Sequence, residues 1–493
     1  MKIIILGAGR IGESVAGTLV SERNEITVID TDARRLRELQ DRFELRGVHG
    51  SGIEPEVLAE AGARDADMLI ACAALDETNL VCCKLAHQQF NIPTRIARVR
   101  SSAYRGDSPL LDKEKGFAVD RVICPEESLT RYIAKLVEYP EALQVREFAD
   151  GLACLVSVRA VSGAPLVRHS IAELRERVPD ADMRIVAIYR RLPDEPDRFI
   201  VCEGATRIEP GDEVFVLSAR AHLKAVLAAL HRHDEARGAR REVARIMIVG
   251  GGRVGLRMAR QLVEGERRVQ LKLLERDADR CVALASALPD DVLVLHGDGT
   301  DEDLLDDEGI EQIDLFLALT NDDEDNIMAS LLAKRMGATR VLALINRRTY
   351  ADLMHGTQID IALSPAQTML GELLAHVRQG DVQVVHSLRR GVAEALEIVA
   401  RGDRKTSRVV GRCIDEIALP KGAQFGLIMR GLRTADASGA DAEAGGEEPA
   451  PPQVIIPRGN TVIESDDHVV IFIPRKRQVR EVEKLFRVSA TFF

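Results

Sequence analysis

The pattern of apolar and polar residues alternates between two periods in the first part of the chain. Short apolar runs such as Ile3–Ile5 are typical of strands buried on both faces. Between such runs, apolar residues recur at helical spacing, as at Ile11, Val15 and Leu19. The pattern predicts strands at 2–6, 25–29, 45–48, 68–73 and 95–99, and helices at 10–21, 32–42, 54–62 and 77–89. Strands that alternate with helices over short connections predict an α/β fold with a doubly wound parallel sheet.

A glycine-rich turn joins the first predicted strand to the first predicted helix. Residues 6–12 read Leu-Gly-Ala-Gly-Arg-Ile-Gly. In a dinucleotide-binding turn, Gly7 would allow the tight turn, Gly9 would let a pyrophosphate approach the backbone, and Gly12 would let the helix pack close to the strand. The second predicted strand ends at Asp30, where an acidic residue can accept hydrogen bonds from a ribose diol. An acidic residue here disfavours a 2′-phosphate, so NAD or an adenine nucleotide is preferred over NADP.

The candidate ligand-binding residues follow or end the predicted strands, because ligands of such sheets bind beyond the C-terminal strand ends. Arg10 could pair with a phosphate, although an ordinary solvated arginine is an equal alternative. Arg98 ends an apolar strand, an unusual place for a charge, which favours a functional role. Asp76 to Asn79 open the next helix, and Asp76, Glu77 and Thr78 are interpreted as ordinary N-terminal capping. The predicted first site consists of Gly7, Ala8, Gly9, Arg10, Ile11, Gly12, Asp30, Ser51, Ala73, Ala74 and Arg98.

The same arrangement of motifs begins again near residue 245, which indicates an internal duplication. The His-Gly-Ser-Gly segment at 49–52 parallels His-Gly-Asp-Gly at 296–299, and Asp-Glu-Thr-Asn at 76–79 parallels Asp-Glu-Asp-Asn at 323–326. The second copy has no match for Arg98, since it reads Ala343-Leu-Ile-Asn-Arg347, which predicts a weaker, altered or empty site. The predicted second site consists of Gly250, Gly251, Gly252, Arg253, Val254, Gly255, Glu275, Asp298, Thr320 and Asn321.

A smaller, strand-rich segment follows each copy. The first has apolar runs at 152–161, 184–190, 198–202 and 213–218 and a helix at 221–230. We therefore predict nucleotide-binding domains at 1–125 and 245–365, and small α+β domains at 141–230 and 381–490. A helix at 126–137 is expected to connect the first pair, and the charged stretch 231–244 is expected to be a linker. Residues 433–453, rich in Ala, Gly, Pro and acidic residues, are predicted to be a disordered insertion.

Composition narrows the possible functions of this 493-residue chain. The net charge of −11 and the absence of Trp argue against nucleic-acid binding. The N-terminus lacks the features of a signal peptide and no apolar run is long enough to span a membrane, so a cytoplasmic location is expected. The eight cysteines show no metal-ligand spacing and are expected to be free thiols. The acidic runs 301–307 and 322–325 could hold a cation, although solvated helix starts are the simpler interpretation.

Catalysis is not indicated by the residues around the predicted nucleotide sites. A hydride-transfer enzyme needs an acid–base group and usually an arginine that faces the nicotinamide. The small domains carry no such set, and the chain has no P-loop motif. Nucleotide sensing is therefore the leading hypothesis, with no catalytic residues and no metal, and an NAD-dependent oxidoreductase is the alternative.

The two glycine turns with Asp30 and Glu275, the paired His-Gly and Asp-Glu segments and the small domain behind each copy resemble the TrkA family. This family comprises the peripheral subunits of Trk potassium uptake systems, built from tandem RCK (KTN) units, and the resemblance covers nearly the whole chain. It implies binding of NAD or NADH, with ATP or ADP as further ligands. It also implies a ring, a homotetramer, at the inner face of the plasma membrane. There it would dock on an integral-membrane potassium channel-like subunit of the TrkH or TrkG type, whose pore responds to nucleotide state through the ring's shape. Family members commonly carry Thr where this chain has Ala73, which removes one polar contact from the first site.

Overall fold

The computed structural model describes residues 1–22, 24–101, 104, 108–179, 181–192, 195–200, 202–231, 243–265, 267–354, 358–378, 381–388, 392–432 and 451–488. These residues divide into two compact units. The parallel-sheet unit contains Met1–Arg131 and Arg245–Leu370, and the antiparallel-sheet unit contains Tyr132–Ala244 and Gly371–Phe493. Most of the predicted linker (232–242) and of the predicted insertion (433–450) lies outside the described residues, and Gln453, the last residue of that insertion, belongs to a strand.

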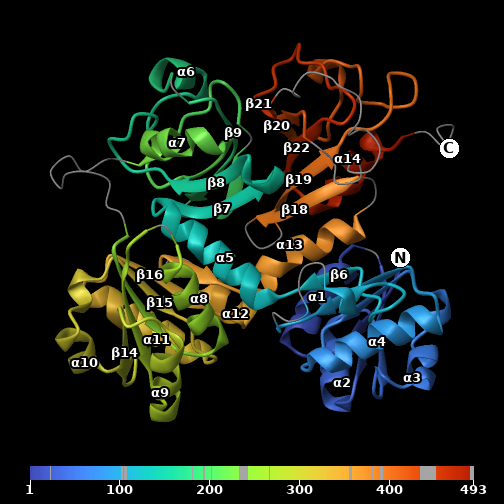
Figure 1. Ribbon diagram of the computed structural model, residues 1–493. Coiled ribbons are helices and arrows are strands. Elements are labelled where there is room, and N and C mark those ends of the chain that lie inside the picture. The colour runs from blue at the N-terminus through green and yellow to red at the C-terminus, as the bar shows by residue number, and fades with distance from the viewer. Residues whose placement is uncertain are drawn as a thin grey trace, which may run out of the picture. The chain divides into compact units, whose positions relative to one another are not determined.

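The first sheet of the parallel-sheet unit is a doubly wound sheet with the strand order β3-β2-β1-β4-β5-β6. Its helices α1 to α4 are drawn in blue in Figure 1. All its pairings are parallel, as the sequence pattern predicts. The sixth strand was not predicted. The strands are β1 (Lys2–Leu6), β2 (Glu25–Asp30), β3 (Arg46–His49), β4 (Met68–Ala71), β5 (Thr94–Arg98) and β6 (Arg121–Ile123), and the helices are α1 (Arg10–Val20), α2 (Ala33–Arg42), α3 (Pro55–Glu60) and α4 (Asp76–Gln88).

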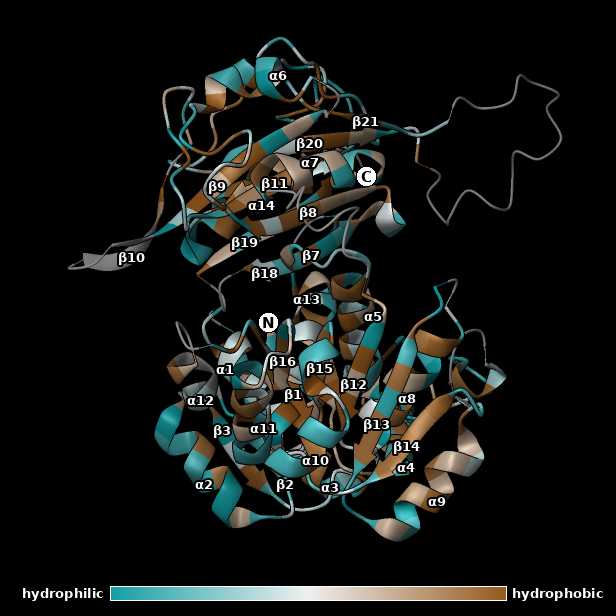
Figure 2. Ribbon diagram, turned by 90° about the vertical axis from the view of Figure 1, so that its left-hand side faces the viewer, coloured by the Kyte–Doolittle hydropathy of each residue, from teal (hydrophilic) through white to brown (hydrophobic). Residues whose placement is uncertain are grey.

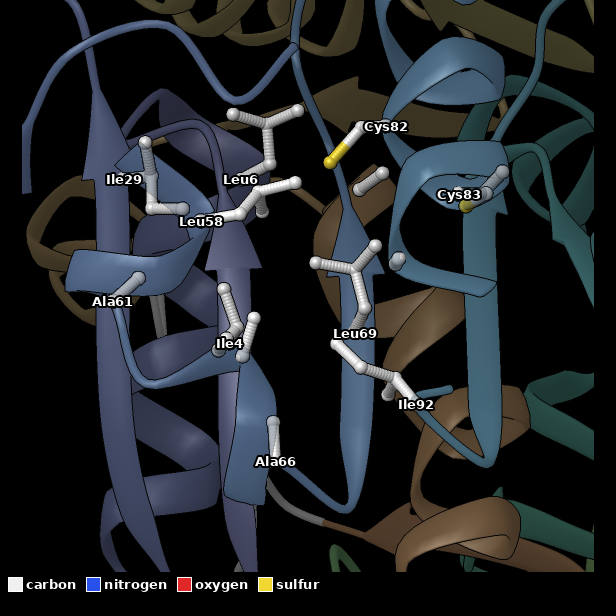
Figure 3. Close-up of a cluster of buried hydrophobic side chains, with 14 of the residues drawn as sticks. Ile4, Leu6, Ile29, Leu58, Ala61, Ala66, Leu69, Cys82, Cys83 and Ile92 are labelled. Atoms are coloured by element: carbon white, nitrogen blue, oxygen red, sulfur yellow. The ribbon is translucent and has the colours of Figure 1, made fainter. Parts of the chain in front are cut away.

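One core of this sheet lies against α3 and α4 (Figure 3). Ile4 and Leu69 project from the strands toward Leu58 of α3 and toward Cys82 and Cys83 of α4, and all five side chains are buried. Burial raises the pKa of the Cys82 thiol to about 12, so the thiol stays protonated. All eight cysteines are free, and five of them are buried, as expected.

The second sheet repeats the first, with the order β14-β13-β12-β15-β16-β17. The aspartates that open the two acidic runs cap helices: Asp301 accepts hydrogen bonds from the N–H groups of Asp303 and Leu304, and Asp322 accepts one from Asp325. The strands are β12 (Arg245–Val249), β13 (Gln270–Glu275), β14 (Val292–His296), β15 (Leu315–Ala318), β16 (Arg340–Leu344) and β17 (Ile361–Leu363), and the helices are α8 (Arg253–Val263), α9 (Ala278–Ala287), α10 (Glu302–Asp307), α11 (Asp323–Arg335) and α12 (Arg348–Leu353).

The antiparallel-sheet unit holds two five-stranded sheets of identical topology. Their orders are β7-β8-β11-β9-β10 and β18-β19-β22-β20-β21, so the duplication extends to the small domains. The edge strand β7 was not predicted. The strands are β7 (Ala142–Phe148), β8 (Ala153–Arg159), β9 (Met183–Leu192), β10 (Glu195–Ile200), β11 (Glu213–Ala219), β18 (Val382–Leu388), β19 (Ala393–Val399), β20 (Gln424–Arg430), β21 (Gln453–Ile455) and β22 (His468–Ile473), and the helices are α6 (Leu174–Arg177), α7 (Leu223–Leu230) and α14 (Val479–Phe486). Two further helices, α5 (Pro125–Glu138) and α13 (Pro365–Val377), begin in the parallel-sheet unit and end in this one.

The two antiparallel sheets share one hydrophobic core. Phe148 and Phe215 of the first sheet pack in the same buried cluster as Leu388 and Phe472 of the second. His386 Nε2 lies 2.7 Å from the carbonyl oxygen of Glu147, and its ring meets Phe148 edge to face. Burial lowers the pKa of His386 to about 3, so its neutral ring forms this contact. The sheets therefore depend on each other for burial of their apolar faces.

Hydrophobic residues are concentrated in the strands, whereas helices such as α2 are largely hydrophilic (Figure 2). Within the described ranges, none of the helices combines the length and the apolar character needed to cross a bilayer.

Candidate functional site

The glycine turn after β1 is shaped by two glycines and leaves room over a third. Gly7 has φ +102°, which favours glycine. A Cβ at Gly12 would lie 1.8 Å from the carbonyl oxygen of Gly7, so α1 can approach the turn only without a side chain there. A Cβ at Gly9 would meet nothing within 4 Å, and no side chain caps α1 at this residue. The turn therefore offers open space and a helix N-terminus to a phosphate.

Asp30, the last residue of β2, is fixed beside this turn by two backbone N–H groups. Its Oδ2 accepts a hydrogen bond from Ala8 N at 2.5 Å, and its Oδ1 accepts one from Asp32 N at 2.8 Å. Each carboxylate oxygen can accept a second hydrogen bond, so both can still accept one from a ribose hydroxyl. The geometry thus combines a phosphate position with an oriented acceptor for a diol.

Two side chains of α4 hold the ends of β4 and β5. The buried carboxamide of Asn79 accepts a hydrogen bond from Ala73 N at 2.8 Å and donates to the carbonyls of Ala73 and Arg98 at 3.1 and 2.9 Å. Asp76 accepts hydrogen bonds from Arg100 N and Ser101 N, each at 2.9 Å. Asp76 and Glu77 do lie in the first turn of α4, as expected, but no side chain caps the helix at Leu75. The Asp76 carboxylate instead reaches across to the residues after β5, which sequence reasoning did not predict.

Arg98 has a partner that lies far from it in the sequence. Its Nη2 is 2.9 Å from Glu126 Oε1 in the first turn of α5, and Arg100 Nε is 3.3 Å from the same oxygen. Burial alone would raise the pKa of Glu126, but the charges of Arg98 and Arg100, together with a hydrogen bond from its own backbone, lower it below the ordinary value. Sequence reasoning found Arg98 but missed Glu126, which stands in an ordinary capping position of a predicted helix.

The second copy reproduces the backbone framework of the first. Gly250 has φ +100°, and a Cβ at Gly255 would lie 1.9 Å from the Gly250 carbonyl oxygen. Glu275 accepts hydrogen bonds from Gly251 N at 2.8 Å and Asp277 N at 3.0 Å. Asn326 bonds Thr320 N, Thr320 O and Leu344 O, as Asn79 does in the first copy. The two parallel sheets therefore have similar backbone contacts at the C-terminal ends of their strands, and we call these two regions the sheet edges.

Comparison with known proteins agrees with this duplicated framework. The model of the TrkA-N domain matches residues 3–125 and again 246–365, and the model of the TrkA-C domain matches residues 155–231. The Trk system potassium uptake protein TrkA of Halomonas elongata is 47% identical over 493 residues, with full coverage of both chains. The protein of the same name from Vibrio alginolyticus is 46% identical over 492 residues, again over the full length of both.

The chain belongs to the TrkA family. Its relatives are named as potassium uptake proteins and not as enzymes, so the oxidoreductase alternative is set aside. Among solved structures, the RCK domain of GsuK matches with a TM-score of 0.57 and 18% identity, over 98% of this chain and 94% of that one. A structure described as the GsuK channel bound to NAD matches with a TM-score of 0.55 and 18% identity, over 98% of this chain and 78% of that one. These two structures support the tandem RCK fold.

The two TrkA-N copies differ most where Arg98 stands. By the shared asparagine contact, Leu344 corresponds to Arg98. Pro125 and Pro365 begin α5 and α13, so Ala366 corresponds to Glu126. The ion pair of the first copy is thus replaced by two apolar residues. Arg347, the nearby cation of the second copy, instead contacts Glu324 and Tyr350.

The groove beside the glycine turn also differs between the TrkA-N copies. In the second copy, Arg280 Nε donates to the Gly251 carbonyl at 2.9 Å, and a Cβ at Gly251 would lie 2.2 Å from Leu284 Cδ1. The corresponding first-copy residue is Ala8, and a pocket of about 230 Å³ opens beside it. Its lining consists of Ala8, Gly9, Arg10, Glu13, Arg35, Glu38, Leu39 and Arg42.

The remaining predicted residues lie at the same two sheet edges. Ser51 follows β3, and Asp298, at the corresponding place after β14, accepts hydrogen bonds from the backbone and side chain of Thr300, which lower the pKa of its carboxyl. The Thr320 hydroxyl contacts Asn326 Oδ1 at 2.8 Å, a contact that Ala73 cannot make in the first copy. Arg10 and Ile11 begin α1, and Arg253 and Val254 begin α8 directly after its N-cap Gly252. Ala74 lies between β4 and α4, and Asn321 lies between β15 and α11.

Proposed function

We propose that this chain is the nucleotide-sensing regulatory subunit of a potassium uptake system. The observation that carries the proposal is a pair of sheet edges, each with a glycine turn and an acidic strand end bonded to it, in a chain matched over its full length by TrkA proteins. A protein that senses nucleotides needs binding sites without a reacting group, and these edges meet that need.

The proposed ligands are NAD or NADH, and ATP or ADP. Gly9 and Gly252 leave open space where a pyrophosphate would lie, since a Cβ at either meets nothing within 4 Å. Asp30 and Glu275 would accept hydrogen bonds from a ribose diol, which makes a 2′-phosphorylated ligand the poorer fit. Arg98 would add positive charge for a phosphate in the first site alone.

The proposed partner is an integral-membrane, channel-like potassium subunit of the TrkH or TrkG type. The chain would act at the cytoplasmic face of the membrane as a homotetrameric ring. A nucleotide that binds two ring shapes with a difference of about 1–3 kcal/mol would bias the pore about 5- to 150-fold. Tight binding alone would not gate the pore, because only differential binding shifts the equilibrium.

The nucleotide sites are tested by calorimetric titration of NAD and ATP into the full chain. Asp30→Ala and Glu275→Ala should each weaken binding at one site about tenfold or more, because a charge-assisted hydrogen bond is lost. Asp41→Ala, an exposed carboxylate on α2, is the matched control and should leave both affinities unchanged. Equal affinities in the wild type and both site variants would refute the assignment.

The partner is tested by recovering the tagged chain from membranes in mild detergent, with and without nucleotide. Co-purification of a polytopic potassium-transport subunit is the expected result, and nucleotide titration of potassium flux would then measure gating. Recovery of the chain without any membrane protein in either condition would contradict the proposed role.

A further inference from the structure

The N-terminal turn of α5 contacts both TrkA-N copies within the parallel-sheet unit. Glu126 faces the first site, where its Oε1 lies near Arg98 and Arg100 at 2.9 and 3.3 Å. The next residue, Glu127, faces α8 of the second copy, where its Oε2 lies 3.5 Å from Arg257 Nη2. Adjacent carboxylates of one helical turn are thus bound to cations of different copies.

A second contact of Arg257 and an ion pair within α5 hold this turn in place. Arg257 Nη1 also lies 3.5 Å from Cys124 Sγ, directly before α5. The other carboxylate oxygen of Glu127 is 3.5 Å from Arg131 Nη2, one turn further along α5. Arg257 therefore contacts Glu127 of α5 and Cys124 directly before it, so a displacement of the turn would shift the contacts of α8.

The helix that Arg257 belongs to is the phosphate-facing helix of the second site. α8 begins at Arg253, directly after the open glycine Gly252, and Arg257 follows one helical turn later on the same face. The charge of Arg253 in the second copy also reaches the first copy: burial lowers the pKa of Arg100, and the charges of Arg98 and Arg253 lower it further, although Glu126 and Asp76 oppose them.

The residues at the corresponding positions of the duplication lack these charges. Counted from the glycine turns, Ser14 of α1 corresponds to Arg257. Counted from Pro125 and Pro365, the residues of α13 that correspond to Glu126 and Glu127 are Ala366 and Gln367. These three neutral residues make the reverse pair a matched reference.

We propose that the first turn of α5 couples the two nucleotide sites of one chain. A phosphate at the first site competes with Glu126 for Arg98 and Arg100, and the resulting shift of the turn passes through Glu127 to Arg257 and α8. Glu127 and Arg257 are positioning residues, since they touch neither proposed ligand position. The inference rests on the proposed nucleotide binding. Because the Glu127–Arg257 pair is about one-third exposed, we expect a coupling factor of about fivefold.

The coupling is measured with NAD on the full chain by calorimetry. Asp30→Ala weakens the first site, so a titration at NAD concentrations that leave this site empty gives the affinity of the second site. Glu275→Ala gives the affinity of the first site in the same way. The coupling factor is the product of the two NAD dissociation constants from the variants divided by the product of the two constants measured on the intact chain. Glu127→Gln and Arg257→Gln should each return the factor to about one, with no further change in the double variant.

Ser14→Ala and Gln367→Ala are the matched controls and should leave the factor unchanged. A factor of one in the intact chain would overturn the coupling, as would a factor that survives Glu127→Gln. Binding of NAD at one site only would overturn the coupling and leave the proposed function standing. No NAD binding by the intact chain would overturn both.

Discussion

The two TrkA-N copies retain the same backbone contacts and differ in the charges placed on them. Both have a left-handed glycine, a glycine without room for a Cβ, an acidic strand end bonded to the turn and a buried asparagine clamp. Only the first has the Arg98–Glu126 pair, whose place is taken by Leu344 and Ala366 in the second. The backbone contacts at the strand ends have been kept in both copies, whereas the buried ion pair at the end of β5 has no counterpart in the second.

The largest expected effect comes from the glycines beneath the two turns. Gly12→Ala and Gly255→Ala would each place a methyl group within 2 Å of a backbone carbonyl, which no side-chain movement can relieve. Each should lower the free energy of unfolding by more than about 3 kcal/mol, equally in the two copies. Thermal unfolding of the variants measures this, with Gly9→Ala as a control that meets no atom. A tolerated Gly12→Ala would show that the close approach is not needed.

The asparagine clamps should come next. Asn79→Ala and Asn326→Ala each leave three backbone groups without their partner, two of them on the second residue after the strand end. A loss of about 2–3 kcal/mol is expected for each, because buried polar groups lose their hydrogen bonds. Chemical denaturation measures the loss, and markedly unequal losses would mean that the framework is not shared.

Arg98→Leu places in the first copy the residue type that the second copy has at the corresponding position, Leu344. It should cost about 2 kcal/mol of stability, because Glu126 remains as a largely buried charge without its closest cation. Arg98→Leu combined with Glu126→Ala should restore most of the loss, since the second copy folds with that pair of residues. If the double variant is as unstable as the single one, the ion pair itself is needed.

The pH dependence of the folding stability should also differ between the two copies, with a smaller effect than that of Arg98→Leu. The pKa of Glu126 is lowered in the folded chain, so the stability it contributes is present above the ordinary pKa of glutamate and is lost as the pH falls through the lowered value. Glu126→Gln should flatten the acid limb of the stability curve. Ala366→Gln, at the corresponding place of the second copy, should leave that limb unchanged.

The smallest effect is expected at the threonine of the second copy. The Thr320 hydroxyl bonds Asn326 and the backbone N–H of Asp322, so Thr320→Ala should cost about 1 kcal/mol. Ala73→Thr should restore the same contact in the first copy and stabilise it by a similar or smaller amount. Denaturant midpoints measured on both variants check this, and a destabilising Ala73→Thr would contradict the equivalence.

The sequence predicted most strands of the parallel sheets because their apolar runs are continuous. Ile3–Ile5 and Ile246–Val249 lie in central strands that are covered on both faces. β6 was missed because three residues, Arg121–Ile123, show no period. β7 was missed because Ala142, Val145 and Phe148 are buried at a spacing of three, which matches neither alternation nor a continuous run.

The candidate site was predictable where the chemistry is local. Asp30 and its glycine turn follow from spacing in one βα unit. The partners Glu126 and Arg257 were not predictable, since each contact joins residues far apart in the chain and depends on where α5 is placed. The packing of the two small domains around one core was missed for the same reason. The apolar pattern of a strand predicts that one face is buried, but not which sheet packs against it.

The shared core of the antiparallel-sheet unit has a consequence for how the chain is made. Phe148 and Phe215 leave the ribosome long before Leu388 and Phe472, with which they are buried. At ordinary rates of synthesis, the first sheet would wait roughly 10–50 s for the second. During that time its apolar face is open to chaperones and to the same face of neighbouring nascent chains. We therefore expect expression of residues 1–244 alone to yield aggregates or chaperone-bound chains, whereas the full chain buries the face in cis.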